Sequence, residues 1–544
     1  MNDIEFNLID EPWIRVIDNN CSISEVSLKE AIVNAHKYKK LSGELPTQDI
    51  AVMRLILAVL HTVISRYDET GAASDLDDDE DEALERWKAW WDNGRFPEKA
   101  VTAYLGKWHE RFWLFHPERP FYQIDQQNMM SQITKQQRIE LSKLNAEISK
   151  SGNKKNFFSS GPEQVQNTLS YSQAARWLVN LNSFDDSAIK PQGKNMDSAT
   201  VAWCGQLGVV FLMGNSLFET LMLNLVMINC NHVEYKETPI WEKAIINTAE
   251  RIRMTPPNNL AELYTFQSRR IHLFRDDGKI IYYHNLAGDL LSNENAFFEP
   301  MTIWRKSKGT EEKYEPMPHE SPKQMWKEFS VLYQKEGNQK SGVVNWYQNY
   351  LYANSLINEK SVLKTSIVCV KYDSSSSHKI LNSYSDTLTM HSALLSELGR
   401  NWRSSIEIEI QKCEKLAYET GRYAQELFIA SGGSNSSKDK HYSEISSEVK
   451  EQLYYRLDIP FREWLREIDP KSDLQTKQNI IAKWRDTAKK IAFEYAEELV
   501  REQPDTAFIG HMIKDEKKNK TVLYSAPKAM NSYRYSVNKV YEGE

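Results

Sequence analysis

The stretch between residues 151 and 164 contains the residue types best suited to binding chemistry. It reads SGNKKNFFSSGPEQ, and its candidate residues are Lys154, Lys155, Asn156, Phe157 and Phe158. Aromatic rings stack on bases and lysines neutralise phosphates, so this combination is typical of a loop that binds nucleic acid. The two phenylalanines could instead anchor the loop in the protein core, and the residue types alone favour neither interpretation.

A second polar loop lies at 183–198 and offers amide side chains. Its candidate residues are Gln192, Gly193, Lys194 and Asn195. Glycine lets the backbone approach a ligand closely, and Gln or Asn can hydrogen-bond to the edges of bases. One predicted helix, 169–181, separates this loop from the first. We therefore expect both loops to lie near each other on one edge of a domain.

A metal site is the competing interpretation of the aromatic region around residue 110. His109-Glu110 resembles the start of H-E-x-x-H, the zinc-protease helix. The fifth position is Trp113, so the second histidine ligand is missing. His116 is further along the chain, and Pro117 would break the helix before His116 could share its face. A metal-dependent hydrolase stays an alternative, but aromatic packing explains the segment better.

Composition limits the class of protein further. The chain has 544 residues, a formal net charge of −7 and five cysteines without a C-x-x-C pair. A free-standing nucleic-acid binder usually has a basic domain, so only local basic patches are expected here. Scattered cysteines indicate neither a zinc ribbon nor a redox pair. Because nucleophile-elbow and Walker motifs are also missing, we expect no enzyme activity, no metal and no cofactor.

The loops need a framework, and residues 209–226 predict its centre. Val209–Met213 is a short apolar run that suits a buried strand. Gly214 then turns the chain, and Ser216 with Glu219 forms an S-x-x-E capping box for an apolar helix. A helix that is apolar almost all round is buried in a core. The glycine signatures of nucleotide-binding loops are missing, which disfavours a phosphate site here.

Strand and helix patterns divide the rest of the chain. Residues 263–310 are predicted to be β-rich, with Asp277-Gly278 at a hairpin turn. Basic residues gather along this region at Arg269, Arg270, Arg275, Lys279, Arg305 and Lys306. Helical spacing prevails from Ser385 onward, and helices are predicted at 441–468, 473–503 and 527–540. Short loops between amphipathic helices indicate an antiparallel bundle.

We therefore predict an α+β protein with a mixed α/β domain at 1–380 and a helical-bundle domain at 381–544. The sequence contains no uninterrupted apolar run of the length needed to cross a membrane. The N-terminus lacks a basic segment followed by an apolar block, so it is not read as a secretory signal. A cytoplasmic location is expected.

Three segments carry a family resemblance. In chain order they are NLIDEPWIRV (7–16), FHPERPFYQ (115–123) and GNSLFETLMLNLV (214–226), followed by the helical region. Together they resemble CasA, the large subunit of the type I-E CRISPR Cascade surveillance complex. The resemblance extends through the whole chain, although it is loose between these segments.

The resemblance implies a non-catalytic subunit with several partners. The expected partners are the 5′ handle of the guide RNA (crRNA), double-stranded target DNA, the small and handle-binding Cascade subunits, and the nuclease-helicase. Such a subunit reads the protospacer-adjacent motif (PAM), largely through the minor groove, and wedges the duplex open. It implies a mixed N-terminal domain and a C-terminal four-helix bundle. A purely structural assembly subunit is the other alternative.

The resemblance also assigns positions, with departures. It places the first recognition loop on 153–161 and the glycine-rich loop on 187–195, where this chain has a single glycine at 193. The duplex wedge falls on Ser374, Ser375, Ser376 and Ser377, where relatives have Asn and Gln. Lys279 is the candidate for a groove-reading lysine. Arg305, Lys306 and Lys371 are candidate phosphate contacts, which would make binding fall with salt.

Overall fold

The computed structural model describes residues 4–133, 139, 141, 168–187, 200–230, 232–244, 257–294, 296–307, 313–318, 324–333, 338–358, 362–373, 380–435, 439–515 and 520–542. The chain divides into two compact units. The N-terminal unit comprises residues 1–323, 331–358 and 364–387, and the C-terminal unit comprises 324–330, 359–363 and 388–544. Helices and antiparallel strands both contribute to the fold, in agreement with the predicted α+β class.

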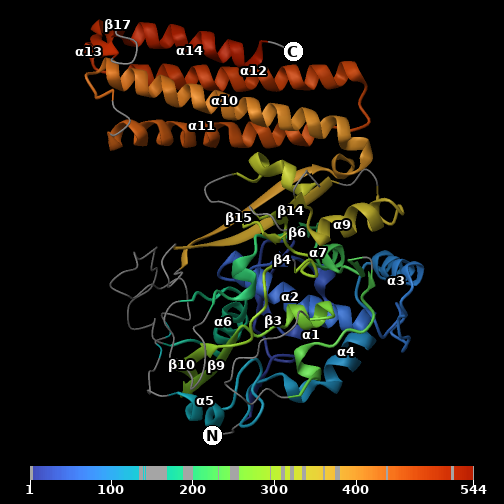
Figure 1. Ribbon diagram of the computed structural model, residues 1–544. Helices are drawn as coiled ribbons and strands as arrows, with labels where there is room; N and C mark the ends of the chain where they lie inside the picture. Colours follow the sequence, from blue (N-terminus) through green and yellow to red (C-terminus); the bar gives the residue numbers. More distant parts are fainter. Residues whose placement is uncertain are drawn as a thin grey trace. The chain divides into compact units, whose positions relative to one another are not determined.

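The N-terminal unit contains short helices and most of the strands (Figure 1). Its α-helices are α1 (Leu28–Val33), α2 (Pro46–Ile64), α3 (Glu80–Asn93), α4 (Glu98–Lys107), α5 (Gln126–Gln132), α6 (Tyr171–Phe184), α7 (Leu217–Asn224), α8 (Leu260–Tyr264) and α9 (Gly342–Trp346). The strands up to residue 233 are β1 (Glu5–Asn7), β2 (Ile14–Asp18), β3 (Ile23–Val26), β4 (Tyr38–Leu41), β5 (Trp113–Phe115), β6 (Val209–Met213), β7 (Ile228–Asn229) and β8 (His232–Val233). The later strands are β9 (Arg269–Asp276), β10 (Lys279–Ala287), β11 (Trp304–Lys306), β12 (Tyr314–Pro316), β13 (Asn338–Gln339), β14 (Val362–Tyr372) and β15 (Ile380–His391).

Helix α2 forms the centre of the N-terminal unit. Its side chains are buried on every side, because α4, α6, α7 and α8 all contact it. Arg54 within it forms a buried ion pair with Glu299 at 2.9 Å. Among the described residues, α2 is also long and apolar enough to cross a membrane, yet 94% of the relevant window is buried inside the protein. Core helices of water-soluble proteins have the same composition.

The predicted piece at 209–226 is present as β6 and α7. Ser216 caps α7 by accepting a hydrogen bond from the Glu219 amide, as predicted. The Glu219 carboxylate departs from the capping-box pattern, because it accepts from the amide of Asn215 at 2.6 Å. Strand β6 lies in a three-stranded sheet in the order β15-β14-β6. Gly214 leaves no room for a side chain, since a Cβ there would lie 2.2 Å from that of Glu219.

The C-terminal unit is built from long helices, which run side by side in Figure 1. Its elements are α10 (Arg400–Ala430), α11 (Lys440–Glu467), α12 (Leu474–Arg501), α13 (Asp505–Ile509), β16 (His511–Asp515), β17 (Lys520–Tyr524) and α14 (Ala526–Tyr541). Helix α10 contacts α11, α12 and α14. Trp326, from a distant part of the sequence, stacks on Phe461 with ring centroids 4.2 Å apart and donates a hydrogen bond to Asp458.

Three local predictions were wrong. Residues 385–391 belong to strand β15, in which Leu388 and Met390 are buried at a spacing of two residues. The predicted helical region thus begins later, and Leu398 is 56% exposed. The predicted β-rich region, 263–310, was wrong at its start, where its first two residues belong to α8 (Leu260–Tyr264). The β16–β17 hairpin has no counterpart in the predicted all-helical region.

Candidate nucleic-acid interface

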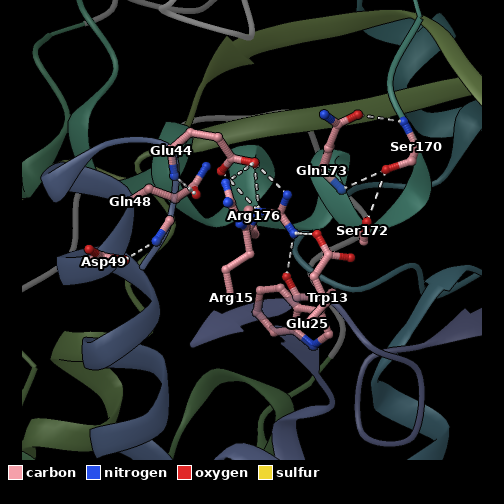
Figure 2. A network of polar contacts seen from close by, with 11 residues as sticks. Trp13, Arg15, Glu25, Glu44, Gln48, Asp49, Ser170, Ser172, Gln173 and Arg176 are labelled. Atoms are coloured by element: carbon pink, nitrogen blue, oxygen red, sulfur yellow. Dashed lines mark hydrogen bonds and ion pairs between the residues drawn. The ribbon is translucent and has the colours of Figure 1, made fainter. Parts of the chain in front are cut away.

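Helix α6 connects the two segments that contain the predicted loops. It begins at Tyr171, just after the first segment, and ends at Phe184, just before the second. Its start is fixed by a capping box. The Ser170 hydroxyl accepts from the Gln173 amide, and the Gln173 side chain accepts from the Ser170 amide (Figure 2). A capping box satisfies two otherwise unpaired amides and so defines where the helix begins.

Arg176 holds α6 against the sheet ordered β3-β2-β4 (Figure 2). Its side chain is 2% exposed and donates to Glu44 at 3.0 Å, to Glu25 at 2.7 Å and to the Trp13 carbonyl at 2.7 Å. Burial alone would raise the pKa of Glu44. The hydrogen bonds and charge of Arg176 outweigh that effect and lower the pKa. The buried charge is thus paired and hydrogen-bonded, which burial requires.

The β9–β10 hairpin pairs with the chain before and after the first loop segment. Its turn residues Asp277 and Gly278 both have positive φ, as a two-residue hairpin turn needs. Ile139, before the loop segment, bridges to Tyr283. Leu169, after it, bridges to Ile280 through hydrogen bonds of 2.9 and 3.1 Å. The backbone on either side of the loop segment therefore pairs with the same strand, β10.

Arg269, at the start of β9, joins the two ends of the second loop segment. Its Nη2 donates to the carbonyls of Asp186 at 2.8 Å and Thr200 at 2.7 Å. Its Nε donates to the Asp185 carboxylate at 2.5 Å. The Ala202 amide also donates to the Asp185 carbonyl, at 2.9 Å. Residues 185–186 and 200–202 are thereby held side by side.

Tyr372 brings the end of β14 to the same place. Its hydroxyl donates to the Phe184 carbonyl at 2.8 Å. Burial raises the pKa of Tyr372 well above its usual value, and the negative charges of Asp185 and Asp186 raise it further. Asn285 of β10 completes the arrangement by donating to the Asp185 carboxylate at 3.1 Å. We call Asp185, Arg269, Asn285 and Tyr372 the loop-base cluster.

The loop-base cluster thus lies where the second segment begins and ends and where the third begins, and Asn285 connects it to β10, the strand that pairs with the chain before and after the first. These segments are the ones in which the sequence places its candidate residues, although the residues themselves lie outside the described part of the chain. They are Lys154, Lys155, Asn156, Phe157 and Phe158 in the first, Gln192, Gly193, Lys194 and Asn195 in the second, and Ser374, Ser375, Ser376 and Ser377 in the third. Their roles stay predictions.

The predicted phosphate contacts are divided among three sheets. Lys279 is exposed and precedes Ile280, which pairs with the end of the first loop segment. Lys371 is exposed and precedes Tyr372 of the loop-base cluster. Arg305 and Lys306 are exposed on β11, a strand of a different sheet. Of the four, only Lys279 and Lys371 are adjacent in sequence to residues at the loop bases.

Two arginines that the sequence analysis grouped with the basic patch are internal. Arg269 is 2% exposed and Arg270 is 1% exposed. Arg270 pairs with Asp289 at 2.5 Å, as Arg269 does with Asp185. Neither guanidinium can meet a phosphate, because burial and internal hydrogen bonds occupy it. The basic residues that gather in this part of the sequence therefore do not form one surface patch, because these two arginines pair with carboxylates in the interior.

The alternative metal site receives no support from its geometry. His109 Nε2 lies 2.9 Å from an Asp10 carboxylate oxygen, and Asn7 contacts its other ring nitrogen at 3.4 Å. His116 Nδ1 accepts from the backbone amides of Glu118 and Arg119, each at 3.1 Å. Burial lowers the pKa of His116, and the Arg119 charge lowers it further. Among the described residues, His, Cys, Asp and Glu form no group suited to a metal ion.

Sequence reasoning missed the loop-base cluster itself. Arg269 was noted only as one of several basic residues, and Asp185 and Tyr372 had no assigned role. One signal was available, since Asp185-Asp186 lies at the start of the second loop and a carboxylate that is buried needs a charged partner.

Comparison with known proteins places this chain in a family. The sequence profile described as CRISPR-associated protein Cse1 matches residues 7–495. The CRISPR-associated protein CasA/Cse1 of Thermus thermophilus is 24% identical over 503 residues, covering 90% of this chain and 91% of that protein. The crystal structure of Thermobifida fusca Cse1 superimposes with a TM-score of 0.81 at 26% identity, covering 98% of both chains.

A chain of a solved CRISPR RNA-guided surveillance complex shares the fold as well. Its TM-score is 0.68 at 16% identity, with 98% of this chain and 99% of that chain covered. Identity at that level establishes the fold alone. The profile match spans most of the sequence, including the three segments that carry the resemblance. The chain therefore belongs to the CRISPR-associated Cse1 family.

Proposed function

We propose that this chain is the large, non-catalytic subunit of a type I-E CRISPR Cascade ribonucleoprotein and recognises the protospacer-adjacent motif in duplex DNA. Membership of the Cse1 family and the fold shared with a chain of an RNA-guided surveillance complex support it. The observation that carries the site assignment is the convergence of three loop-bearing segments on the loop-base cluster.

Convergence matters because a short DNA motif must be contacted from several sides at once. Loop residues can read base edges while nearby lysines fix the backbone. Lys279 and Lys371 are exposed next to the loop bases, where they could contact phosphates. The chain needs no general basic surface, because guide-RNA pairing checks the remaining target sequence in RNA-guided systems. A net charge of −7 is compatible with that division of labour.

The proposed partners follow from the same role. They are the 5′ handle of the guide RNA, duplex target DNA, the small and handle-binding Cascade subunits, and the nuclease-helicase that destroys the opened target. We propose that the N-terminal unit reads and opens the duplex. The C-terminal unit, as a four-helix bundle, mediates assembly. A complex of this kind would work in the cytoplasm, where its target DNA is found.

Reconstitution with guide RNA tests the proposal. Target-duplex binding is compared with the subunit present, absent, and carrying Phe157→Ala with Phe158→Ala. We expect the subunit to be required and the double variant to lose preference for the adjacent motif. Base stacking on an aromatic ring contributes about 1–3 kcal/mol to binding, so the double variant should also bind more weakly. Ser159→Ala with Ser160→Ala, in the same loop, is the matched control.

The alternatives predict different results. If the phenylalanine variant assembles and discriminates motifs as wild type does, those rings belong to the core and recognition moves to Gln192–Lys194. If no loop variant alters DNA binding, the chain is a purely structural assembly subunit. Hydrolysis lost on His109→Ala would instead favour the enzyme alternative.

A further inference from the structure

Arg269 makes several hydrogen bonds at the base of the second loop segment. All its hydrogen bonds are internal, and they reach both sides of the second loop segment. The acceptors are the Asp185 carboxylate and the carbonyls of Asp185, Asp186, Thr200 and Ser268. A guanidinium presents its donors in a planar fork and keeps its charge at any physiological pH. These properties suit a permanent clamp.

The geometry of the clamp fixes the spacing of the two chain ends. A single nitrogen, Nη2, bonds to the carbonyls of both Asp186 and Thr200. Those carbonyls lie on opposite sides of the 188–199 segment, so they cannot separate without breaking one bond. The Asp185 carboxylate neutralises the buried charge, which would otherwise make the arrangement costly. The clamp therefore defines the direction in which the second loop segment leaves and re-enters the fold.

The Asp185 carboxylate also connects Arg269 to the neighbouring segments. Asn285 donates to Asp185 from β10, the strand that pairs with both ends of the first loop segment. The backbone carbonyl of Phe184, the residue before Asp185, accepts a hydrogen bond from the hydroxyl of Tyr372 at the end of β14. A shift of residues 184–186 would thus move contacts to all three segments. Such contiguous contacts are a physical route for coupling between loops.

We propose that Arg269 is a positioning residue that fixes the two ends of the second recognition loop. We propose further that it couples the position of this loop to that of the first loop and of the segment between β14 and β15. This inference rests on the proposed function for its meaning in DNA recognition. It extends that function by assigning discrimination between motifs to a buried residue that does not touch DNA. Arg269 should therefore affect the preference for one motif over another more than the overall attraction to DNA.

Arg269→Lys tests the proposal, and Arg270→Lys is its matched control. Lysine keeps the charge but carries its donors on one nitrogen, so it lacks the planar fork that bonds to the Asp185 carboxylate through Nε and to both carbonyls through Nη2. Arg270 is adjacent on the same strand, equally buried and paired with Asp289, yet none of its described contacts reaches a loop base. The control therefore reports the general cost of disturbing a buried arginine.

Two measurements separate this inference from the proposed function. The first is the hydrogen-exchange rate of the Ala202 backbone amide in the isolated chain, because this amide donates a hydrogen bond to the Asp185 carbonyl. We expect Arg269→Lys to accelerate exchange there by about tenfold or more through local opening, while Arg270→Lys leaves it near the wild-type rate. In the reconstituted complex, Arg269→Lys should lower the ratio of affinities for correct and incorrect motifs by about fivefold or more, with a smaller change for Arg270→Lys.

The outcomes are distinct. Equal exchange at Ala202 in Arg269→Lys and wild type, or equal acceleration in both variants, would overturn the clamp. Faster exchange without a change in motif preference would overturn the coupling to recognition. If the wild-type complex shows no motif preference, the proposed function fails, but the exchange data still test whether Arg269 holds the two chain ends together. Should Arg269→Lys not fold, Asp185→Asn removes the carboxylate and leaves the backbone carbonyls, and the same two results are expected.

Discussion

The Tyr372 hydroxyl donates a 2.8 Å hydrogen bond to the backbone carbonyl of Phe184, joining the end of β14 to the end of α6. These two elements are distant in sequence, and each leads into a segment with predicted recognition residues. The bond also lies against Gly205, where the space is too small for any side chain. A Cβ at that position would lie 2.1 Å from the Tyr372 hydroxyl oxygen and 2.8 Å from a Val201 methyl carbon.

Gly205→Ala should therefore destabilise the N-terminal unit by disturbing Tyr372. An overpacked site usually costs about 1–3 kcal/mol, and loss of the Tyr372 hydrogen bond would add to the strain. Urea unfolding of the isolated chain measures the change in the free energy of unfolding. Gly106→Ala is a suitable control, because no atom lies within 4 Å of the position that an added Cβ would occupy. Gly94→Ala is not suitable, because Gly94 has a positive φ.

A double-mutant cycle with Tyr372→Phe identifies the cause. Phenylalanine removes the oxygen at 2.1 Å and leaves the ring carbon at 3.0 Å as the nearest Tyr372 atom. Gly205→Ala should then cost less in the Tyr372→Phe background than in wild type, with a coupling of about 0.5–3 kcal/mol. Strictly additive effects would show that the alanine strains another neighbour and that the Tyr372 contact is not the sensitive one.

Local sequence signals account for the elements that were predicted well. The Ser216 cap, the apolar run of β6 and the Asp277-Gly278 turn each depend on a few neighbouring residues, whose preferences act without the rest of the fold. The long helices α11, α12 and α14 begin and end within a few residues of their predicted bounds. In each case local propensity and tertiary packing favour the same structure.

Long-range pairing explains what the sequence could not reveal. Arg269 looks like a surface cation, because its partner Asp185 lies 84 positions away. The pattern of α2 suggests one core face, yet the helix is enclosed on all sides by elements from several parts of the chain. Residues 385–391 of strand β15 were predicted to be helical, because the position of Leu388 fits both a helical and a strand period. The pairing of β15 with β14 makes them a strand.

The candidate site, too, could be predicted only in part from the sequence. The loops were identified by residue type, and the structure adds where their bases meet. It also shows that the three segments carrying the resemblance include core positions, since Trp13, Phe121 and Leu221 are buried. Family resemblance in this chain therefore reflects packing at those positions. The contacts of the loops with DNA stay predictions, because the candidate residues lie outside the described part of the chain.

Removing an exposed lysine beside a loop base should change the salt dependence of DNA binding. Lys279→Ala and Lys371→Ala should each reduce the slope of log K against log salt by about one, because each lost phosphate contact releases about one counterion fewer. Equilibrium binding of the reconstituted complex to a motif-bearing duplex, measured across salt concentrations, gives the slope. Lys99→Ala, an exposed lysine on α4, removes the same charge elsewhere and should leave the slope unchanged. An identical slope in all variants would place the phosphate contacts on other residues.

Two buried glutamates should make stability depend on pH. Glu234 is 6% exposed and Glu237 is 1% exposed. Burial raises the pKa of both, and the negative charge of Glu237 raises that of Glu234 further. The folded state therefore keeps protons that the unfolded state releases above about pH 4.3. Stability supplied by these protons is complete below that pH and is lost as the pH rises through the raised folded values.

His61, 3.7 Å from Glu237, acts in the opposite direction over a separate range. Burial lowers the pKa of His61 to about 3, so its protonation destabilises the fold only below the ordinary histidine value of about 6.5. Measurements between about pH 7 and pH 9 thus exclude the contribution of His61, while the buried thiols of Cys204 and Cys413, whose pKa is also raised, contribute equally to wild type and variant. Each extra proton held by the folded state lowers the free energy of unfolding by about 1.4 kcal/mol per pH unit.

Glu234→Gln should flatten this alkaline loss of stability. Glutamine keeps the shape and the hydrogen bond to Glu237 but binds no proton, so the slope should fall by up to about one proton relative to wild type. Urea unfolding of the isolated chain at several pH values gives both slopes, and the groups common to the two proteins cancel. Parallel curves for wild type and variant would mean that Glu234 is ionised in the folded state over this range.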